Sequence, residues 1–311
     1  MKKDPRRLFT FGCSYTVYSS GPTWADLLGL EFDYFENWGI PGLGCRAIAE
    51  RIAECHTKNN FTKDDVIIVQ WTTHLRYDYH NPTAPKFHEN VDKLNWKTSG
   101  SIFSEVNRKI LNDNWRKQFF YEPSFIMHCL NHILMIQMLL ESVGCTWYMT
   151  SIGDWCKLST DLDWINGVDD QYKGRPQLSI QEHVTELMPW VKIIWEDRAD
   201  RWVEPLALHA QKTPKDYQYF KDPRAHGATF RELHPSTKHY MTWLNQYLRP
   251  KLGLGAPPDE YQLWCDTVES ITKKNFNNQD KFFDEIGDRE GVKPGWWPED
   301  PNHWPTWIKG W

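Results

Sequence analysis

Ser14 and His234 are of the residue types that acyl transfer requires, a hydroxyl nucleophile and an imidazole base. Ser14 follows a β-rich run over residues 7–12, and Gly12 permits a tight turn before it. A serine at this point presents its hydroxyl at the carboxyl edge of a sheet, where α/β folds place their ligands. The segment therefore predicts a candidate nucleophile, and its alternative interpretation is a serine that only caps a helix.

His234 is the candidate base because its backbone is restrained on both sides. Pro235 follows it and keeps the histidine out of helical geometry. A helix predicted over residues 236–248 begins directly afterwards, with Ser236 or Thr237 as its N-cap, and Pro250 and Gly253 are expected to end it. A general base must be positioned before its pKa matters, and this loop would position one. The alternative is an exposed histidine at a helix start.

Two more segments place polar or flexible groups directly after predicted strands. Residues 37–44, NWGIPGLG, hold three glycines but match neither the dinucleotide-binding nor the P-loop pattern and contain no lysine. They could instead offer one backbone N–H to a reacting carbonyl. Thr72 and Thr73 follow the apolar run over residues 65–71, and their hydroxyls belong to the same sheet edge. The alternative for the threonines is an ordinary polar strand end.

The composition argues against several classes of protein. Residues 256–311 carry 6 basic and 11 acidic side chains, so the net charge of −5 resides there and residues 1–255 are neutral, which gives no footprint for nucleic acid. The longest apolar stretch, residues 125–140, is interrupted by polar side chains, and the amino terminus lacks the apolar core of a signal peptide. Seven scattered cysteines without C-x-x-C spacing indicate reduced thiols and no zinc site.

Strand-like and helical runs alternate along the chain, which predicts a layered α/β domain with a parallel sheet. The expected strands cover residues 7–12, 33–38, 65–71 and 145–151, and the expected helices cover residues 23–30, 42–55, 124–143 and 236–248. Residues 124–143 are apolar almost all round and predict a buried helix that ends at Gly144. Residues 190–195 are either a last strand or the end of a helix.

The domain organisation follows from changes in composition. We expect one domain over residues 1–255 with insertions around residues 77–123 and 153–189. Residues 256–311 form an extension that is helical to about residue 278 and then rich in tryptophan and proline. The 18 tryptophans of the chain either build the core or line a surface that stacks on sugars or on a protein partner.

In their order and spacing the four candidate segments resemble the SGNH/GDSL hydrolases. That family carries a Gly-Asp-Ser block, an Asn-x-Gly…Gly block, a Gly-x-Asn-Asp block and an Asp-x-x-His block. Here the first reads GCS at residues 12–14, the second NWGIPG at residues 37–42, and the last ends in His234. The resemblance covers residues 7–248, about four-fifths of the chain. The cysteine in place of the aspartate and the tryptophan-rich surroundings are similar to those of divergent members found in phages and environmental bacteria.

The resemblance implies a fold and a mechanism. The fold is a three-layer α/β/α sandwich with a mostly parallel, flavodoxin-like sheet. Ser14 would be the nucleophile and His234 the base, while the backbone N–H groups of Ser14 and Gly42, assisted by Thr73, would hold the oxyanion. No metal or cofactor is expected. Cys13 is the rival nucleophile, and by register it points away from His234 if Ser14 points toward it.

Two departures from the family pattern leave it open whether the protein is an enzyme. Thr73, or Thr72 after a slip of one position, stands where the family has an asparagine. Arg231 stands where the family has the aspartate that orients the histidine, and loss of that acid costs about 10⁴ in turnover. Glu232 would replace the aspartate, or the acid comes from elsewhere, or the protein runs as a Ser–His dyad.

Two functional hypotheses follow. The first is a serine esterase that cleaves O-acyl esters of a small molecule or a glycan, for example O-acetyl groups on a polysaccharide. The second is a catalytically impaired structural or binding protein, such as a virion component that assembles with itself or with other virion proteins through residues 256–311, where prolines space Trp296, Trp297, Trp304, Trp307 and Trp311. We expect a location in the host cytoplasm or the virion, with no membrane or nucleic-acid partner.

Overall fold

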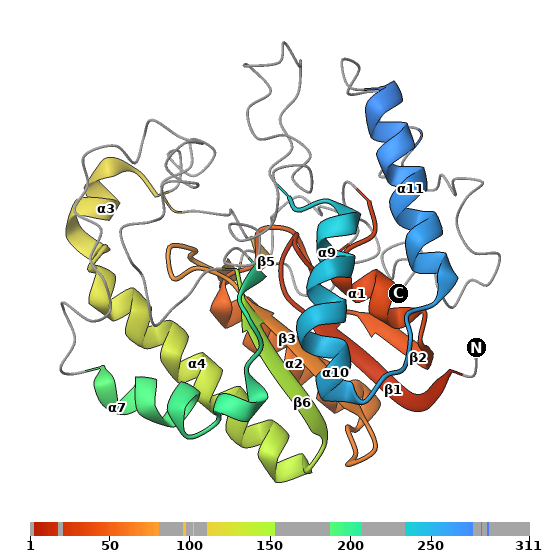
Figure 1. Ribbon diagram of the computed structural model, residues 1–311. Helices are drawn as coiled ribbons and strands as arrows, with labels where there is room; N and C mark the ends of the chain where they lie inside the picture. The colour runs from red at the N-terminus through yellow and green to blue at the C-terminus, as the bar shows by residue number, and fades with distance from the viewer. Residues whose placement is uncertain are drawn as a thin grey trace.

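A parallel sheet of four strands forms the middle layer of the domain (Figure 1). The computed structural model describes residues 3–17, 21–80, 96–97, 102, 111–152, 187–206, 234–275, 281 and 285. The sheet has the order β2-β1-β3-β6, where β1 is Asp4–Phe11, β2 is Phe32–Asn37, β3 is Val66–Trp71 and β6 is Thr146–Ser151. Every residue of β3 is buried, as a central strand covered on both faces requires.

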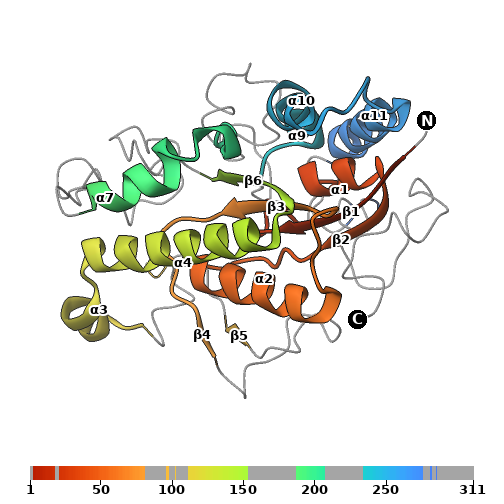
Figure 2. The ribbon, with the colours of Figure 1, turned by 90° about the horizontal axis from the view of Figure 1, so that it is seen from below.

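Helices cover both faces of the sheet (Figure 2). One face carries α1 (Trp24–Gly29), α9 (Thr237–Trp243) and α10 (Arg249–Leu252), with a π-helical segment, Leu244–Leu248, between the last two. The other face carries α2 (Cys45–Asn59) and α4 (Glu122–Val143). The predicted three-layer α/β/α fold is confirmed.

The remaining elements lie around these layers. They are α3 (Asp113–Phe119), α7 (Met188–Val191) with the π-helical Lys192–Glu196, the 3₁₀ turn Ala199–Arg201, α11 (Asp259–Lys274), and an antiparallel pair of β4 (Tyr79–His80) and β5 (Trp96–Lys97). Residues 190–195 are thus helical, the second of the two predicted alternatives. α11 packs against α9, so the first part of the extension belongs to the body of the domain.

The strand order contains one reversal. From β1 the chain passes first to β2 on one side and then to β3 on the other, so the carboxyl ends of β1 and β3 flank the reversal. Open α/β sheets bind their ligands outside the strand ends at such a point. On the outer side of β6, Met149 pairs with Trp202 in an isolated parallel β-bridge. The topology therefore marks the turns after β1 and β3 as the expected ligand edge.

Large aromatic side chains fill the core on both faces of the sheet. Trp24, Trp71, Trp147 and Trp243 are all at most 2% exposed. The rings of Trp24 and Trp243 lie 6.0 Å apart and join α1 to α9. These four tryptophans follow the first of the two predicted uses, a core built from aromatic side chains.

Residues 124–143 form the predicted helix, but it is buried only in part. The helix exists and ends at Gly144 in left-handed conformation, but only one side of it is covered. Ile133 is fully buried against the core, whereas Met135 is 64% and Met138 is 59% exposed. By length and composition alone α4 could cross a membrane, yet its buried side packs on α2 as part of the core.

Of the two residues predicted to end the helix over residues 236–248, Pro250 does not end it, because the helical backbone continues to Leu252. Pro250 lies in the first turn of α10, directly after the wider π-helical segment, and the first turn is the part of a helix that tolerates proline. Gly253 then ends the helix with φ of 70°, as predicted.

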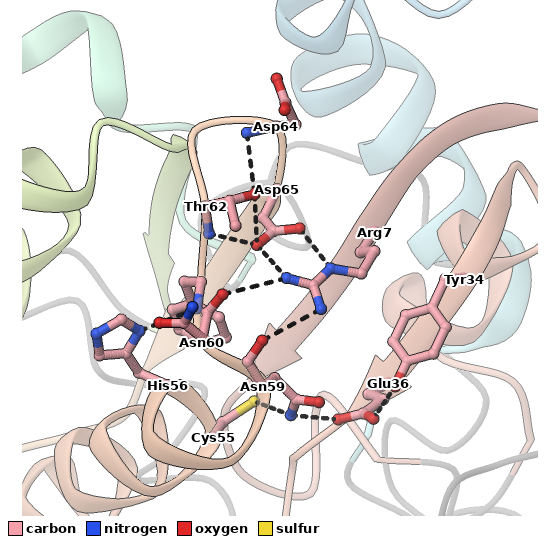
Figure 3. Close-up of polar contacts among 11 residues, drawn as sticks. Arg7, Tyr34, Glu36, Cys55, His56, Asn59, Asn60, Thr62, Asp64 and Asp65 are labelled. Carbon is pink, nitrogen blue, oxygen red and sulfur yellow. Dashed lines mark hydrogen bonds and ion pairs between the residues drawn. The ribbon is translucent and has the colours of Figure 1, made fainter.

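An ion pair braces the amino edge of the sheet, opposite the predicted ligand edge (Figure 3). The Arg7 guanidinium donates to both carboxylate oxygens of Asp65, each at 2.7 Å, and so joins β1 to the residue before β3. Arg7 also donates to the carbonyl of Asn59 at the end of α2. Asp65 accepts a further bond from the backbone N–H of Thr62. This bidentate arrangement fixes the two central strands relative to each other.

Candidate functional site

Ser14 lies in a tight turn directly after β1. The Cys13 carbonyl accepts bonds from the N–H groups of Thr16 and Val17, at 2.9 and 3.2 Å. A Cβ atom at Gly12 would lie only 2.1 Å from the Thr16 hydroxyl, so the turn needs glycine there. Ser14 is partly exposed, whereas Cys13 is fully buried. The turn therefore presents the serine rather than the cysteine to solvent.

The turn that carries Ser14 is tied to the loop after β2. Asn37 donates from its amide to the Thr16 carbonyl at 2.7 Å and accepts from the Gly39 N–H at 3.0 Å. The Ile40 N–H donates to the Gly12 carbonyl. Asn37 is 3% exposed, so these bonds are shielded from water. The asparagine of the second block thus acts as a link that holds the first and second blocks together.

Gly42 occupies the corner of the second block. Its φ is +82°, a conformation that favours glycine, and Pro41 precedes it. The Leu43 N–H donates to the Ile40 carbonyl at 3.4 Å, which closes a turn of the Pro-Gly type. The partly exposed Gly42 lies at the same sheet edge as the Ser14 turn. Its proposed role as an oxyanion donor stays a prediction.

Thr73, rather than Thr72, is the accessible residue after β3. Thr73 is partly exposed, and its hydroxyl oxygen accepts a bond from the Leu75 N–H at 2.9 Å. Thr72 is fully buried, and its carbonyl accepts from the Cys45 thiol. Of the two threonines, Thr73 is therefore the better match to the position where the family has an asparagine. A second polar link, from the Thr16 hydroxyl to the Gln70 side chain at 2.6 Å, joins the Ser14 turn to β3.

His234 lies beside the Ser14 turn although 220 residues separate them in the chain. Its ring centroid is 5.0 Å from that of Tyr15, with the rings tilted by 56°. Ser236 caps α9 by accepting from the His239 N–H, as predicted, and the Thr237 hydroxyl donates to the Pro22 carbonyl at 2.9 Å. These contacts fix the histidine loop against the segment that follows Ser14.

Some predicted site residues and segments lie outside the described residues. They are Glu232, Arg231, most of the 77–123 and 153–189 insertions, and the tryptophans of residues 296–311. The acid that would support His234 therefore stays a prediction.

Asp78 is a buried acid near the candidate site that the sequence did not reveal. Its carboxylate accepts from the N–H groups of Gly44 and Ala47, at 2.7 and 3.0 Å, and so caps α2 from 34 residues away. A Cβ atom at Gly44 would lie 2.4 Å from this carboxylate. Burial raises the pKa of Asp78, and the two backbone donors counteract that rise. Arg76 donates to the Leu43 carbonyl at 2.8 Å, which fastens the same two segments a second time.

Replacing Asp78 with alanine is expected to lower the free energy of unfolding by about 1–3 kcal/mol, because two buried backbone donors at the start of α2 lose their acceptor. Denaturant unfolding measures this change. The matched control is Asp64→Ala, since the exposed Asp64 lies in the loop before β3 and its backbone donates only a weak bond to Thr62. Equal stabilities of the two variants would contradict the capping role.

The described cysteines act as buried structural thiols. Cys13, Cys45, Cys55, Cys129, Cys145 and Cys265 are all free and buried. Burial raises the pKa of the Cys145 and Cys265 thiols to about 12, which keeps both protonated at neutral pH.

Comparison with known proteins adds little to this description. No family model matches the chain, and no curated protein matches it. Among solved structures, the crystal structure of protein YxiM from Bacillus subtilis is similar over 81% of this chain and 58% of that chain, with 13% identity and a TM-score of 0.38. The chain thus spans less than two thirds of that protein, and a likeness this weak carries no argument about function.

Proposed function

We propose that the protein is a serine ester hydrolase in which Ser14 is the nucleophile and His234 the general base. The observation that supports this most is the contact between the Tyr15 and His234 rings, which lie 5.0 Å apart beside a partly exposed Ser14. The two loops meet at the carboxyl edge of the sheet, next to the reversal of strand order. A nucleophile and a base on adjacent, well-braced loops are what acyl transfer needs.

In this proposal the Ser14 hydroxyl attacks the carbonyl carbon of an ester while the imidazole of His234 takes its proton. The backbone N–H groups of Ser14 and Gly42 hold the oxyanion, and each donor of this kind contributes about 2.7–4 kcal/mol to the transition state. The imidazolium then protonates the leaving alcohol. Water, deprotonated by the same imidazole, cleaves the acyl-serine and releases the carboxylic acid.

Covalent labelling tests the proposal. Incubation with a fluorophosphonate probe is expected to add one phosphonyl group to Ser14, located by peptide mass spectrometry, and prior exposure to p-nitrophenyl acetate is expected to slow the labelling. A Ser14→Ala protein should remain unlabelled. Labelling at another residue, or none in the wild-type protein, would contradict a Ser14 nucleophile.

The second candidate is a binding or structural protein that has kept the fold and lost turnover. Thr73 favours it, because a hydroxyl that already accepts from the Leu75 N–H replaces the longer amide of the family pattern. A wild-type protein that neither takes the probe nor hydrolyses p-nitrophenyl acetate would support this candidate. The assembly role of the tryptophan-rich end of residues 256–311 is tested by comparing the oligomeric state of the chain with and without residues 286–311, a deletion that keeps α11 and Tyr261 in the domain.

A further inference from the structure

α11 lies outside the part of the chain that resembles a hydrolase, yet it packs beside the helix that follows His234. Residues 7–248 carry the resemblance, whereas α11 begins at Asp259. The helix lies alongside α9 in both views of the fold (Figures 1 and 2). Its buried side chains recur at helical spacing along one face, and they are Tyr261, Trp264, Cys265, Val268, Ile271 and Thr272. One face of α11 is therefore turned to the domain.

Two contacts hold this face in place. The Tyr261 hydroxyl donates to the Glu31 carboxylate at 2.5 Å, which anchors the first turn of α11. The Cys265 thiol donates to the Met241 sulfur at 3.7 Å and joins the second turn to α9. Val268 follows three residues after Cys265 on the same face, so its side chain has a defined position in the domain.

Val268 meets the residues that precede α1 at Gly21. Val268 is fully buried, and a Cβ atom placed at Gly21 would lie 3.3 Å from its Cγ1 atom. The same Cβ atom would lie 3.1 Å from the hydroxyl oxygen of Thr237. Gly21 has a φ of +139°, which favours glycine. At this point α11, the start of α9 and the residues before α1 come together as closely as a residue without a side chain permits.

Thr237 connects this meeting point to His234. Its hydroxyl donates to the Pro22 carbonyl at 2.9 Å, and the residue is only 2% exposed. His234 lies three residues before Thr237, and Pro235 between them restricts the backbone. The His234 ring in turn contacts the Tyr15 ring at 5.0 Å. The place of the imidazole beside Tyr15 therefore depends on how firmly Pro22 and Thr237 are held together.

The packing beside the histidine leaves little room for movement. The cavity there has a volume of about 10 Å³, room for about one water molecule, and is lined by residues 21–23, His234, Pro235, Thr237 and Tyr240. Val268→Ala would remove two methyl groups from behind Gly21, and the glycine has no side chain to fill the space. Pro22 would then be free to shift, and the histidine with it.

We infer that Val268 on α11 is a positioning residue for the proposed base, because it holds Pro22 and Thr237 together and so keeps the imidazole of His234 against Tyr15. This inference rests on the proposed function and gives the first part of the extension a role in it. The extension then contributes to turnover from outside the segments that carry the candidate chemistry.

The test measures kcat and KM for p-nitrophenyl acetate in Val268→Ala, at a temperature where its thermal unfolding curve shows it to be folded. kcat is expected to fall about tenfold while KM stays within about twofold of wild type, because a misplaced base slows proton transfer without changing how the ester binds. Val268→Thr should restore kcat. Threonine has the same branched shape, and its hydroxyl can donate to the carbonyl four residues earlier, as Thr272 does to Val268 at 2.7 Å.

The matched control is Cys265→Ala. It removes a buried atom from the same face of α11, but one that contacts Met241 rather than Gly21. This variant should keep the wild-type kcat. If Val268→Ala and Cys265→Ala have equal kcat, or if Val268→Thr is as slow as Val268→Ala, the inference is wrong, because the shape of the side chain at Val268 would then not matter for turnover.

NMR separates failure of this inference from failure of the hydrolase. Nuclear Overhauser effects between the His234 and Tyr15 rings, assigned with a His234→Gln protein, are expected to weaken in Val268→Ala and to stay unchanged in Cys265→Ala. If hydrolysis requires Ser14 but both kcat and these effects survive in Val268→Ala, the positioning role is wrong and the hydrolase stands. If hydrolysis is absent from the wild-type protein, the ring contact alone decides. Its weakening in Val268→Ala alone supports the hold of α11 on His234, and an unchanged contact overturns it.

Discussion

Replacing Ser14 with alanine is expected to lower kcat/KM for p-nitrophenyl acetate by about 10³-fold or more, because the reaction loses its nucleophile while binding and oxyanion donors remain. His234→Ala should cause a loss of similar size. The double variant should have about the same kcat/KM as the less active single variant, since a nucleophile and its base act as one unit. Initial rates measured at matched protein concentration give all three values.

Cys13→Ala is the control for this experiment. Cys13 is fully buried next to Ser14, so its removal leaves a small cavity but takes away no accessible nucleophile. The variant is expected to keep most of the activity. Loss of activity in Cys13→Ala together with survival of activity in Ser14→Ala would reverse the assignment of the nucleophile. Additive losses in Ser14→Ala and His234→Ala would show that the two residues do not act together.

Replacing Arg249 with methionine is expected to lower the free energy of unfolding by about 3–5 kcal/mol, the largest effect on stability that the structure predicts. Arg249 forms an ion pair with Glu31, and both side chains are at most 3% exposed. Tyr261 donates its hydroxyl to the same Glu31 carboxylate at 2.5 Å. This cluster joins the loop before β2 to α10 and α11, so the variant would leave a buried carboxylate without its cation.

The control is Lys273→Met on α11, which breaks an exposed pair with Glu269 and should cost less than about 1 kcal/mol. The double variant Arg249→Met, Glu31→Leu should recover much of the stability, because it removes both buried charges. Chemical denaturation of the four proteins measures these differences. If Arg249→Met costs no more than Lys273→Met, the cluster does not stabilise the fold.

The pH dependence of Arg249→Met gives an independent check on the cluster. Burial raises the pKa of Glu31, and Tyr261 and Arg249 oppose that rise. Without Arg249 the folded-state pKa should be higher still. A carboxyl group whose pKa is raised by folding contributes stability below its unfolded pKa and loses it as pH rises through the folded pKa. The deficit of the variant should therefore be smaller at about pH 4 than at about pH 8.

The elements that were predicted well are those with a strong local signal. The apolar run at residues 65–71 became β3, and the apolar run that ends at Gly144 became α4. Ser236 caps α9 as its position predicts. Each of these elements is decided by a few consecutive residues, and so its signal is visible in the sequence. The signals are an apolar strand pattern, a left-handed glycine and a side-chain cap.

The candidate site was predicted only in part. Ser14, Gly42, Thr73 and His234 could be named from residue type and spacing. Tyr15, whose ring contacts His234, and Asn37, whose amide ties the first two blocks together, had no sequence signal that assigned them these contacts. The contacts of the Tyr77 ring with the rings of Trp115 and Phe125 had no sequence signal either, because these residues meet only where the chain folds back.

The sequence by itself determined the order of the four sheet strands and of the main helices that cover them, the layered α/β class and the residue types available for chemistry. The tertiary structure alone decided that Asp78 caps α2, that Arg249 and Tyr261 meet Glu31, and that one side of α4 stays exposed. Local preferences depend on the backbone and side chains of neighbouring residues and so are written in short patterns. Contacts between residues 34 to 230 positions apart depend on which elements become neighbours, and that choice is made by the packing of the whole domain.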